Sequence, residues 1–388
     1  LQDGRSFDSY FGQYCQSEFP SVSNAPNCAG GPLCCEAMPA SIAGAPACAL
    51  IGPTTDAHVP DPVPECMRSK IAGGKMNGFA LGPADGGCGD PLDFACTGPS
   101  AAVGTPADYW QLLASGASLA DNYFQTYAYA DGPRGPFASL PATQNLLYVE
   151  TARFADDFRL DDTPLLTKTL AHVQVPWAIY AGPSNLGQVS VYNPGAFYDP
   201  DWYPYRSLAG ELDRDIETGV LPSVVLILPD IGDPTTSESP GNPVGPGIAY
   251  VKNVRDEILA SPLYGPNTLV LLTYLTAGGY YDHVPPPAPP GVDVDGSSSK
   301  LSKSGAIYYG PRVPLMAFPP FARPNEISHV QLELTSITRF IEWNWQRGNT
   351  LKANYGDDER RFRDTVVNNL GSLIDPDAAH IEVPIFRD

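Results

Sequence analysis

The histidines are the side chains of this chain best suited to acid–base chemistry, and the sequence holds 5 of them. His283 follows Asp282 in the run GGYYDHVPPP, and a carboxylate beside an imidazole can act as an acid–base pair. The alternative is structural, because the same two residues can fix the turn that follows an apolar segment. His58, His172 and His380 have no recognisable context, so we interpret them as surface or hydrogen-bonded structural residues.

The cysteines indicate disulfide chemistry rather than a metal site. The surrounding sequence is rich in glycine, proline and alanine and would bury little apolar surface by itself, so cross-links are the natural way to hold it. Neither the irregular spacing nor the adjacent pair Cys34 and Cys35 fits a zinc site. We therefore predict four disulfides in an insertion at 13–100 and an oxidising compartment, while the spacing leaves the pairing open. The 8 residues concerned are Cys15, Cys28, Cys34, Cys35, Cys48, Cys66, Cys88 and Cys96.

The overall charge argues against two classes of partner. The formal net charge is −20, which repels nucleic acid and anionic lipid head groups. Cations, basic proteins and neutral glycans are compatible with such a surface, and so is simple solubility. No apolar run approaches the roughly 20 residues of a membrane-spanning helix, and no signal peptide is present. We expect a processed or incomplete chain of a secreted or extracellular-surface protein, with no membrane span and no nucleic-acid partner.

The apolar pattern in the second half of the chain is typical of an α/β fold. Residues 221–228 (LPSVVLIL) and 269–274 (LVLLTY) are aliphatic and β-branched runs that predict buried strands. Between them, 248–260 places apolar residues on one helical face. This strand–helix–strand order predicts a parallel pair with a right-handed crossover. In such folds functional groups lie at the carboxyl ends of the strands, here after Leu228 and Tyr274.

Further segments complete the expected architecture. Residues 108–124 and 335–345 are predicted to be helices, and 313–318 is a candidate third strand. The proline cluster and the GSSSKLSKSG run across 285–310 predict an exposed loop. An aromatic-rich run at 192–205 (YNPGAFYDPDWYPY) could bind carbohydrate or protein, or could be a structural loop packed by its own aromatic rings.

Four segments, in order along the chain, carry a resemblance to one family of enzymes. They are LQDGRSFDSYFG at 1–12, SESPG followed by YVKNVRDEILASP within 229–262, TYLTAGGYYDHVPPP at 273–287, and the stretch from RVPLMAFPPFA to FIEWNW at 312–345. These resemble the ENRSFDxYFG, SEHP, TYDExGGFYDHVPPP and DHTSxxxFIEWNW motifs of the phosphoesterase family, which contains bacterial and fungal phospholipases C and acid phosphatases. Since the segments span nearly the whole chain, we expect a single domain over 1–388.

The resemblance implies a fold and a chemistry. The fold is an alkaline-phosphatase-like three-layer α/β sandwich with a mostly parallel central sheet, here with a Cys-rich loop region near its amino end. The chemistry is phosphoester hydrolysis, in which a divalent metal and an activated Ser or Thr hydroxyl act together. The family has a buried strand that runs directly into its first motif. Because this chain begins within that motif, we expect either missing upstream residues or a partner that fills the position.

The positions that would hold the metal depart from the family pattern. The opening Glu-Asn pair of the family corresponds to Asp3 and Gly4, so one oxygen ligand is lost. The Asp-Glu pair after the 269–274 strand corresponds to Leu275 and Thr276, which removes two carboxylates. A divalent cation requires anionic oxygen donors to offset the loss of its water, so we expect little affinity for a metal here.

The nucleophile and the histidines of the family are replaced as well. The alignment places Asp131 at or near the nucleophile, where the family has Ser or Thr. The histidine of SEHP corresponds to Ser239 and that of DHTS to Leu334, while His329 remains. We therefore predict a secreted, catalytically degenerate member without a cofactor. Its expected role is binding or structural, with other extracellular proteins or glycans as partners.

An active enzyme with an altered site is the alternative. It would be a phosphoric-ester hydrolase of the phospholipase C or acid phosphatase type with a divalent metal, and its candidate residues are Asp3, Asp131, Asp282, His283 and His329. Side chains that share one ion must lie within about 8 Å of one another.

Overall fold

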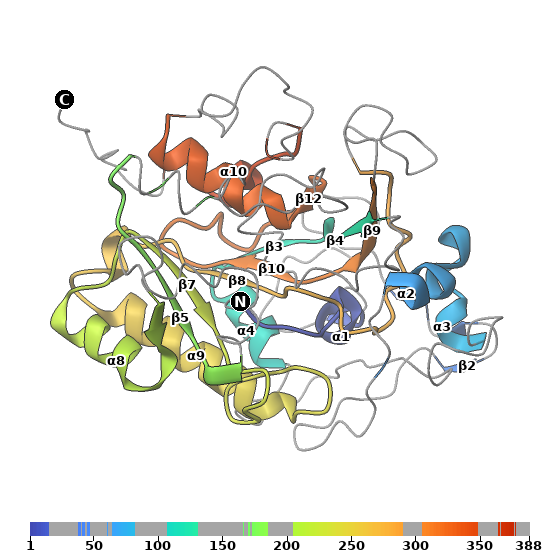
Figure 1. The fold of residues 1–388 in the computed structure, drawn as a ribbon, viewed down its shortest axis with the longest axis horizontal. Helices are drawn as coiled ribbons and strands as arrows, with labels where there is room; N and C mark the ends of the chain where they lie inside the picture. The colour runs from blue at the N-terminus through green and yellow to red at the C-terminus, as the bar shows by residue number, and fades with distance from the viewer. Residues whose placement is uncertain are drawn as a thin grey trace.

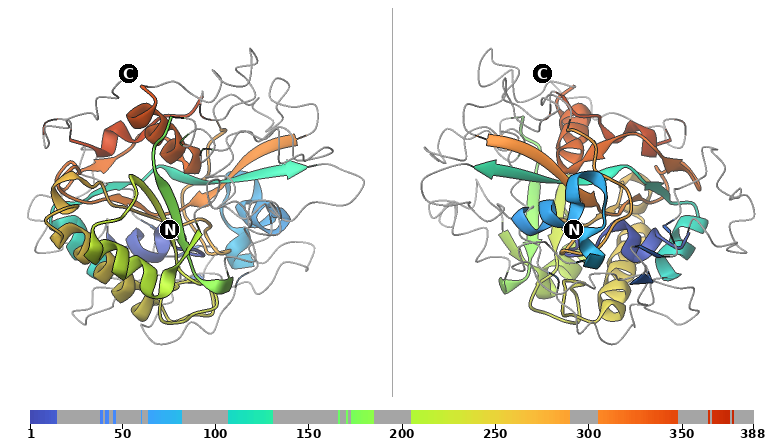
Figure 2. Two further views of the ribbon diagram at one scale, coloured as in Figure 1. Left: turned by 60° about the vertical axis from the view of Figure 1, so that its left-hand side comes forward. Right: turned by 90° about the vertical axis from the view of Figure 1, so that its right-hand side faces the viewer.

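The computed structural model describes residues 1–14, 64–81, 107–130, 173–184, 205–289, 305–347 and 366–375, with a few short stretches between them. Within these residues, strands lie between two groups of helices (Figure 1). Helices α8 (Leu208–Thr218) and α9 (Val244–Ala260) lie on one side of the strands, and α10 (Leu334–Trp345) lies on the other (Figures 1 and 2). The predicted α/β class is confirmed.

The described strands form separate sheets in which parallel and antiparallel pairs both occur. The strand orders are β11-β3-β10-β8, β12-β4-β9 and β6-β5-β7, besides a hairpin of β1 and β2. β5 is parallel to both of its neighbours, but β10 is antiparallel to both of its own, and β9 is antiparallel to β4. The mostly parallel sheet that the resemblance implies is therefore not confirmed by the described strands. The bounds are β1 (Ser41–Ile42), β2 (Ala45–Pro46), β3 (Ser118–Ala120), β4 (Tyr123–Ala130), β5 (Trp177–Ala181), β6 (Tyr205–Ser207), β7 (Val224–Leu228), β8 (Leu271–Thr273), β9 (Gly305–Arg312), β10 (Leu315–Ala317), β11 (Ile327–Ser328) and β12 (Leu332–Glu333).

The predicted strand–helix–strand unit is present as β7, α9 and β8, but its two strands do not pair with each other. Leu1 and Gln2 lie between them at their carboxyl ends. The amino group of Leu1 donates to the carbonyl of Ile227 at 2.8 Å, and the backbone N–H of Gln2 donates to the carbonyl of Thr273 at 2.8 Å. The crossover through α9 therefore spans one strand position instead of joining direct neighbours.

Two predicted boundaries were wrong. The helix expected at 108–124 ends at Ala114, because Gly116 adopts φ +110° and turns the chain into β3. The loop expected at 285–310 is shorter at its far end, since Gly305 to Tyr309 pair with β4 as part of β9. The remaining helices are α1 (Phe7–Phe11), α2 (Pro64–Ile71), α3 (Gly78–Leu81) and α4 (Ala107–Ala114), with 3-10 turns at Ala72–Gly74, Gly265–Asn267 and Leu370–Leu373.

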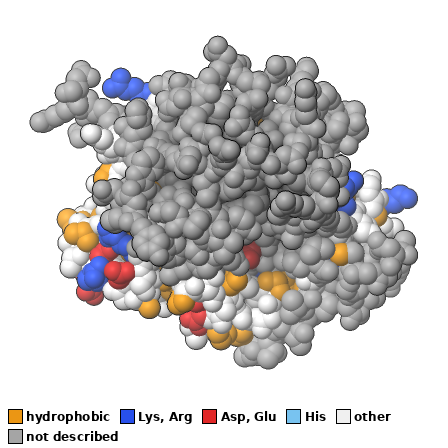
Figure 3. Space-filling model, in the orientation of Figure 1, with side chains coloured by type: hydrophobic (Ala, Val, Ile, Leu, Met, Phe, Trp, Pro, Cys, Tyr) orange, Lys and Arg blue, Asp and Glu red, His pale blue; other side chains and the backbone are white. Residues whose placement is uncertain are grey.

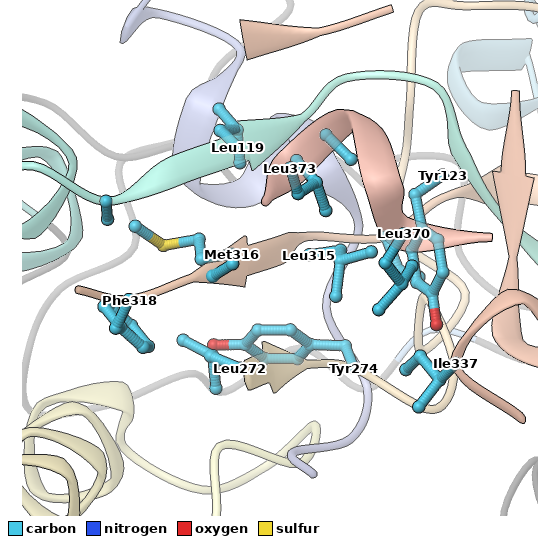
Figure 4. Close-up of a cluster of buried hydrophobic side chains, with 14 of the residues drawn as sticks. Leu119, Tyr123, Leu272, Tyr274, Leu315, Met316, Phe318, Ile337, Leu370 and Leu373 are labelled. Carbon is cyan, nitrogen blue, oxygen red and sulfur yellow. The ribbon is translucent and has the colours of Figure 1, made fainter. Parts of the chain in front are cut away.

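The main core forms where the strands meet α10 (Figure 4). Leucine side chains from β3, β8 and β10 pack against Ile337 of α10 and against the last 3-10 turn. A second, smaller cluster lies between β5 and the helices α8 and α9. On the face drawn in Figure 3, the described surface over α8 carries acidic, basic and apolar side chains together, so no single charge dominates it.

Several sequence predictions concern residues outside the described ranges. Cys66 is buried in α2, whereas the other seven cysteines are not described, so the disulfides stay a prediction. Residues 192–204 and Asp131 also lie outside the described ranges. Among the helices that the structure describes, none combines the length and the apolar character needed to cross a membrane.

Candidate functional site

The opening motif lies against the carboxyl end of β8. Gln2 forms an isolated parallel bridge with Tyr274, and the backbone N–H groups of Gly4 and Arg5 both donate to the carbonyl of Thr276 at 3.1 Å. Gly278 follows with φ +64°, and a Cβ at this position would lie 2.3 Å from the carbonyl oxygen of Gly4. Gly278, the first glycine of the GGYYDH run, is therefore required so that this run and the opening motif can approach each other.

Asp3 and Thr276 contact each other directly at this point. The hydroxyl of Thr276 donates to the Asp3 carboxylate at 2.6 Å and accepts the backbone N–H of Gly278 at 3.2 Å. Burial raises the pKa of the Asp3 carboxyl, and the hydrogen bond from Thr276 only partly opposes this shift. Among the residues that the structure describes, the carboxylate is thus held by a neutral alcohol and by backbone N–H groups, and not by a basic side chain.

Four further positions that match ligands or histidines of the family carry neither a carboxylate nor an imidazole. A Cβ added to Gly4, whose φ is +79°, would lie 2.1 Å from Cδ of Pro240, so the proline ring fills the space beside it. Leu275 is buried in the main core. Ser239 accepts the hydroxyl hydrogen bond of Ser237 at 2.9 Å. Leu334, the first residue of α10, is fully buried as well.

A buried carboxylate lies next to the opening motif, at Glu238 in the connection between β7 and α9. Its side chain accepts hydrogen bonds from the hydroxyls of Tyr109 at 2.6 Å, Tyr274 at 2.8 Å and Tyr10. Burial raises the pKa of the Glu238 carboxyl, and the three hydroxyls and Arg5 oppose the shift. The tyrosines come from α1, from α4 and from the end of β8, so this cluster joins three parts of the chain.

A second buried cluster surrounds Arg312. Its Nη2 contacts Asp282 at 2.7 Å and Asp8 at 3.3 Å, while its Nη1 donates to the carbonyl of Asp121 at 3.0 Å. Nδ1 of His283 lies 2.9 Å from the Asp8 carboxylate. Asp8, Asp282 and His283 bring possible ligand atoms within 4.8 Å of one another. The guanidinium already supplies the positive charge that these carboxylates need, so an added cation would have to compete with it.

The electrostatics of the Arg312 cluster follow from its burial. Burial and the charge of Asp282 raise the pKa of the Asp8 carboxyl, opposed by His283 and Arg312. Burial acts to lower the pKa of His283, but the hydrogen bond and charge of Asp8 outweigh it, so this pKa is raised. Among the described atoms, Nε2 of His283 is buried and has no hydrogen-bond partner.

His329 forms a third group with Asp121. Its Nδ1 lies 2.7 Å from the Asp121 carboxylate, and its side chain is 45% exposed. Burial raises the pKa of Asp121, opposed by the charge of His329. The described candidate residues thus fall into two sets. One is Asp3 with Thr276, and the other surrounds Arg312, with Asp282 and His283 directly beside it and His329 linked to it through Asp121.

Comparison with known proteins gives these groups a family context. The model of the phosphoesterase family matches residues 1–347. The chain belongs to the phosphoesterase family. It is 29% identical over 143 residues to a non-hemolytic phospholipase C of Burkholderia pseudomallei, covering 34% of this chain and 20% of that protein. It is 28% identical over 187 residues to the hemolytic phospholipase C of Pseudomonas aeruginosa (46% and 24%), and 25% identical over 212 residues to non-specific phospholipase C4 of Arabidopsis thaliana (50% and 38%). The matched regions span well under half of these relatives.

Sequence reasoning missed the residues that organise both buried clusters of this phosphoesterase-family chain. Glu238 lies inside the SESPG segment and Asp8 inside RSFDSYFG, but neither was singled out. Arg312 opens the RVPLMAF segment. Charged residues inside apolar or aromatic motifs were the available signal, because a buried charge requires a partner. The sequence did not predict which residue pairs with each buried charge, since Arg312 and Asp8 are 304 positions apart.

Proposed function

We propose that this phosphoesterase-family protein does not hold the catalytic metal of its family and acts without catalysis, through binding or structural support outside the cell. The contact of Asp3 with the Thr276 hydroxyl carries this proposal. At the four positions that match the ligands of the family, Asp3 is the single carboxylate, beside Gly4, Leu275 and Thr276. One carboxylate is too little negative charge to offset the dehydration of a divalent cation.

The packing around these positions supports the same proposal. Pro240 fills the space beside Gly4, and Leu275 packs into the main core. A metal would require that both be displaced or that its ligands come from elsewhere. Meanwhile the clusters of Glu238 and Arg312 keep the motifs joined, as expected where a scaffold is retained for another purpose. The predicted disulfides favour a secreted or extracellular-surface location.

A second candidate is an active phosphoric-ester hydrolase of phospholipase C type with an altered site. The names of the relatives favour it, and so does the buried Nε2 of His283, which has no partner among the described atoms. Against it stands the pairing of Asp8 and Asp282 with Arg312, which leaves little charge for an ion.

Turnover separates the two candidates. The chain, purified and supplied in turn with zinc, calcium, manganese and ferrous ions, should hydrolyse p-nitrophenyl phosphate and phosphatidylcholine no faster than buffer does. Asp3→Asn and His283→Ala variants should give the same background rate. Metal-dependent hydrolysis that disappears in Asp3→Asn would contradict the proposal, and loss in His283→Ala alone would favour the altered site.

A further inference from the structure

His283 is a buried titratable residue that the proposed function does not use. Its side chain is 6% exposed, and its backbone N–H and its Nδ1 contact the Asp8 carboxylate at 2.7 Å and 2.9 Å. Asp8 lies in α1 within the opening motif, whereas His283 ends the GGYYDH run. The pair therefore joins the opening motif to the run that follows β8.

Two further charged side chains surround this pair. Nη2 of Arg312 lies 2.7 Å from the Asp282 carboxylate, 3.3 Å from the Asp8 carboxylate and 3.4 Å from Nδ1 of His283. Asp282 itself lies 3.9 Å from the same Nδ1. All four side chains are buried, so water screens their interactions poorly and their charges must balance within the cluster.

The cluster is neutral only while it keeps one titratable proton. Among the described residues, Asp8 and Asp282 supply two negative charges, and the guanidinium of Arg312 supplies one permanent positive charge. One proton on the pair of Asp8 and His283 completes the balance, whether it lies on the imidazole or on the carboxyl group. Loss of that proton leaves an uncompensated negative charge in a buried place, which costs free energy.

The directions of the pKa shifts agree with this charge balance. Burial acts to lower the pKa of His283, yet that pKa is raised, because Asp8 bonds to the ring and both carboxylates attract its charge. The pKa of the Asp8 carboxyl is raised by burial and by Asp282. A protonated ring also has an N–H at Nε2, which is buried without a partner among the described atoms. The folded chain therefore holds the shared proton more tightly than the unfolded chain, and the unsatisfied N–H limits the difference.

The same cluster fastens α1 to the rest of the molecule. Arg312 comes from β9, and its guanidinium lies 4.3 Å from the centre of the Phe7 ring. Farther along the helix, Tyr10 bonds to Glu238. α1 has only 5 residues, too few for a helix that is stable by itself, so contacts of this kind keep it in place.

Other titratable groups approach from the elements packed around the cluster. His329 is linked to it through Asp121, whose carbonyl accepts a hydrogen bond from Nη1 of Arg312. Glu238 holds α1 from a separate cluster. The effects of both groups must be separated from that of His283 by experiment. Also nearby are Tyr281, whose pKa is raised by burial, and Lys70 of α2, which donates to the carbonyl of Gly279 at 3.5 Å.

We propose that the proton shared by Asp8 and His283 is a conformational switch. While the pair keeps this proton, α1 is fastened against the GGYYDH run and β9, and loss of the proton on a rise in pH releases α1. This inference goes beyond the proposed function and does not depend on it, since none of the four side chains lies at the positions of Asp3 and Thr276.

Hydrogen exchange of residues 5–12 in the intact chain, followed by mass spectrometry from pH 5 to pH 9, tests the switch. A raised pKa stabilises fully below the unfolded value of about 6.5, and the effect is lost as pH rises through the folded value. After correction for the intrinsic pH dependence of exchange, protection should fall about tenfold for each unit by which the pKa of the pair exceeds its unfolded value. Protection that is constant from pH 6 to pH 9 would overturn the proposal.

Two variants should move the protection in opposite directions. His283→Gln keeps a donor toward Asp8 but carries no proton to lose, so α1 should exchange rapidly even at pH 6. Asp8→Asn makes the cluster neutral without the shared proton, so protection should stay at the wild-type pH 6 level up to pH 9. A structural role without a switch predicts loss of protection in both variants, and that result would contradict the proposal.

The neighbouring groups supply the controls. His329→Gln and Glu238→Gln should each keep the pH-dependent fall of the wild type, and loss of the fall in either variant would assign it to that residue instead. A measurement on the wild type does not depend on the folding of any variant. In its proton–nitrogen spectrum, one of the 5 histidines should titrate above about 6.5 with the midpoint of the fall in protection. Absence of such a histidine would refute the switch.

Discussion

Replacing Arg312 by leucine should lower the free energy of unfolding by about 3–5 kcal/mol, because it leaves two buried carboxylates without their cation. The Arg312 side chain is 1% exposed and Asp8 and Asp282 are equally inaccessible, so water cannot compensate the loss. The guanidinium also bonds the carbonyl of Asp121 and lies over the ring of Phe7 at 4.3 Å. Chemical denaturation followed by tryptophan fluorescence measures the change.

The same variant should show a distinctive dependence on pH. Arg312 opposes the rise of the Asp8 pKa, so its removal raises that pKa further. An acid whose folded pKa is raised stabilises the protein fully below its unfolded pKa, and this contribution is lost as pH rises through the folded pKa. The deficit of Arg312→Leu should therefore be smaller at pH 4 than at pH 7. Arg214→Leu, at an exposed arginine of α8, is the matched control and should change little. Equal losses in the two variants would refute this role of the cluster.

Replacing Glu238 by alanine should have an effect of at least similar size, about 3–9 kcal/mol, because it removes the carboxylate that accepts hydrogen bonds from three buried tyrosine hydroxyls, at roughly 1–3 kcal/mol each. Tyr10, Tyr109 and Tyr274 are all at most 1% exposed. Glu238→Gln is the matched control, since the amide oxygen can still accept hydrogen bonds. It should lose less than half as much stability in the same denaturation experiment.

The stability that Glu238 contributes should also depend on pH. Burial raises the pKa of its carboxyl, so the stability that it contributes is present below the unfolded pKa and is lost as pH rises through the folded pKa. Glu238→Gln does not titrate. The stability difference between the wild type and this variant should thus be largest at pH 4 and shrink by pH 8. A difference that grows with pH would show that the hydroxyls hold the carboxylate in its charged form instead.

The elements with the strongest local patterns were predictable from the sequence. The periodic run at 248–260 became part of α9, and the aliphatic runs became β7 and β8. β9 was missed because glycine, serine and proline before it indicated a loop, although AIYY has the β-branched and aromatic character of a strand. The skipped position between β7 and β8 could not be predicted, since a crossover helix has the same pattern whether its strands are neighbours or not.

The candidate site could be predicted from the sequence only in part. The juxtaposition of Asp3 and Thr276 follows from two motifs that sequence reasoning had already paired. The cation beside Asp282 was not predicted, because the sequence run shows His283 next to it while the contact at 2.7 Å comes from Arg312. Contacts of this kind between residues far apart in the sequence depend on the fold, so the spacing of residues along the chain does not predict them. Asp131 lies outside the described residues, and its role stays a prediction.

Direct metal analysis tests whether the catalytic cation of the family has been lost. The 388-residue chain is incubated with excess zinc, calcium, manganese or ferrous ion, freed of unbound ion by gel filtration and measured by plasma mass spectrometry beside an Asp3→Asn variant. We expect no stoichiometric metal in either protein. One ion retained per wild-type chain and lost from Asp3→Asn would show that a divalent cation is bound beside Asp3 and Thr276, and would contradict the loss of the metal site.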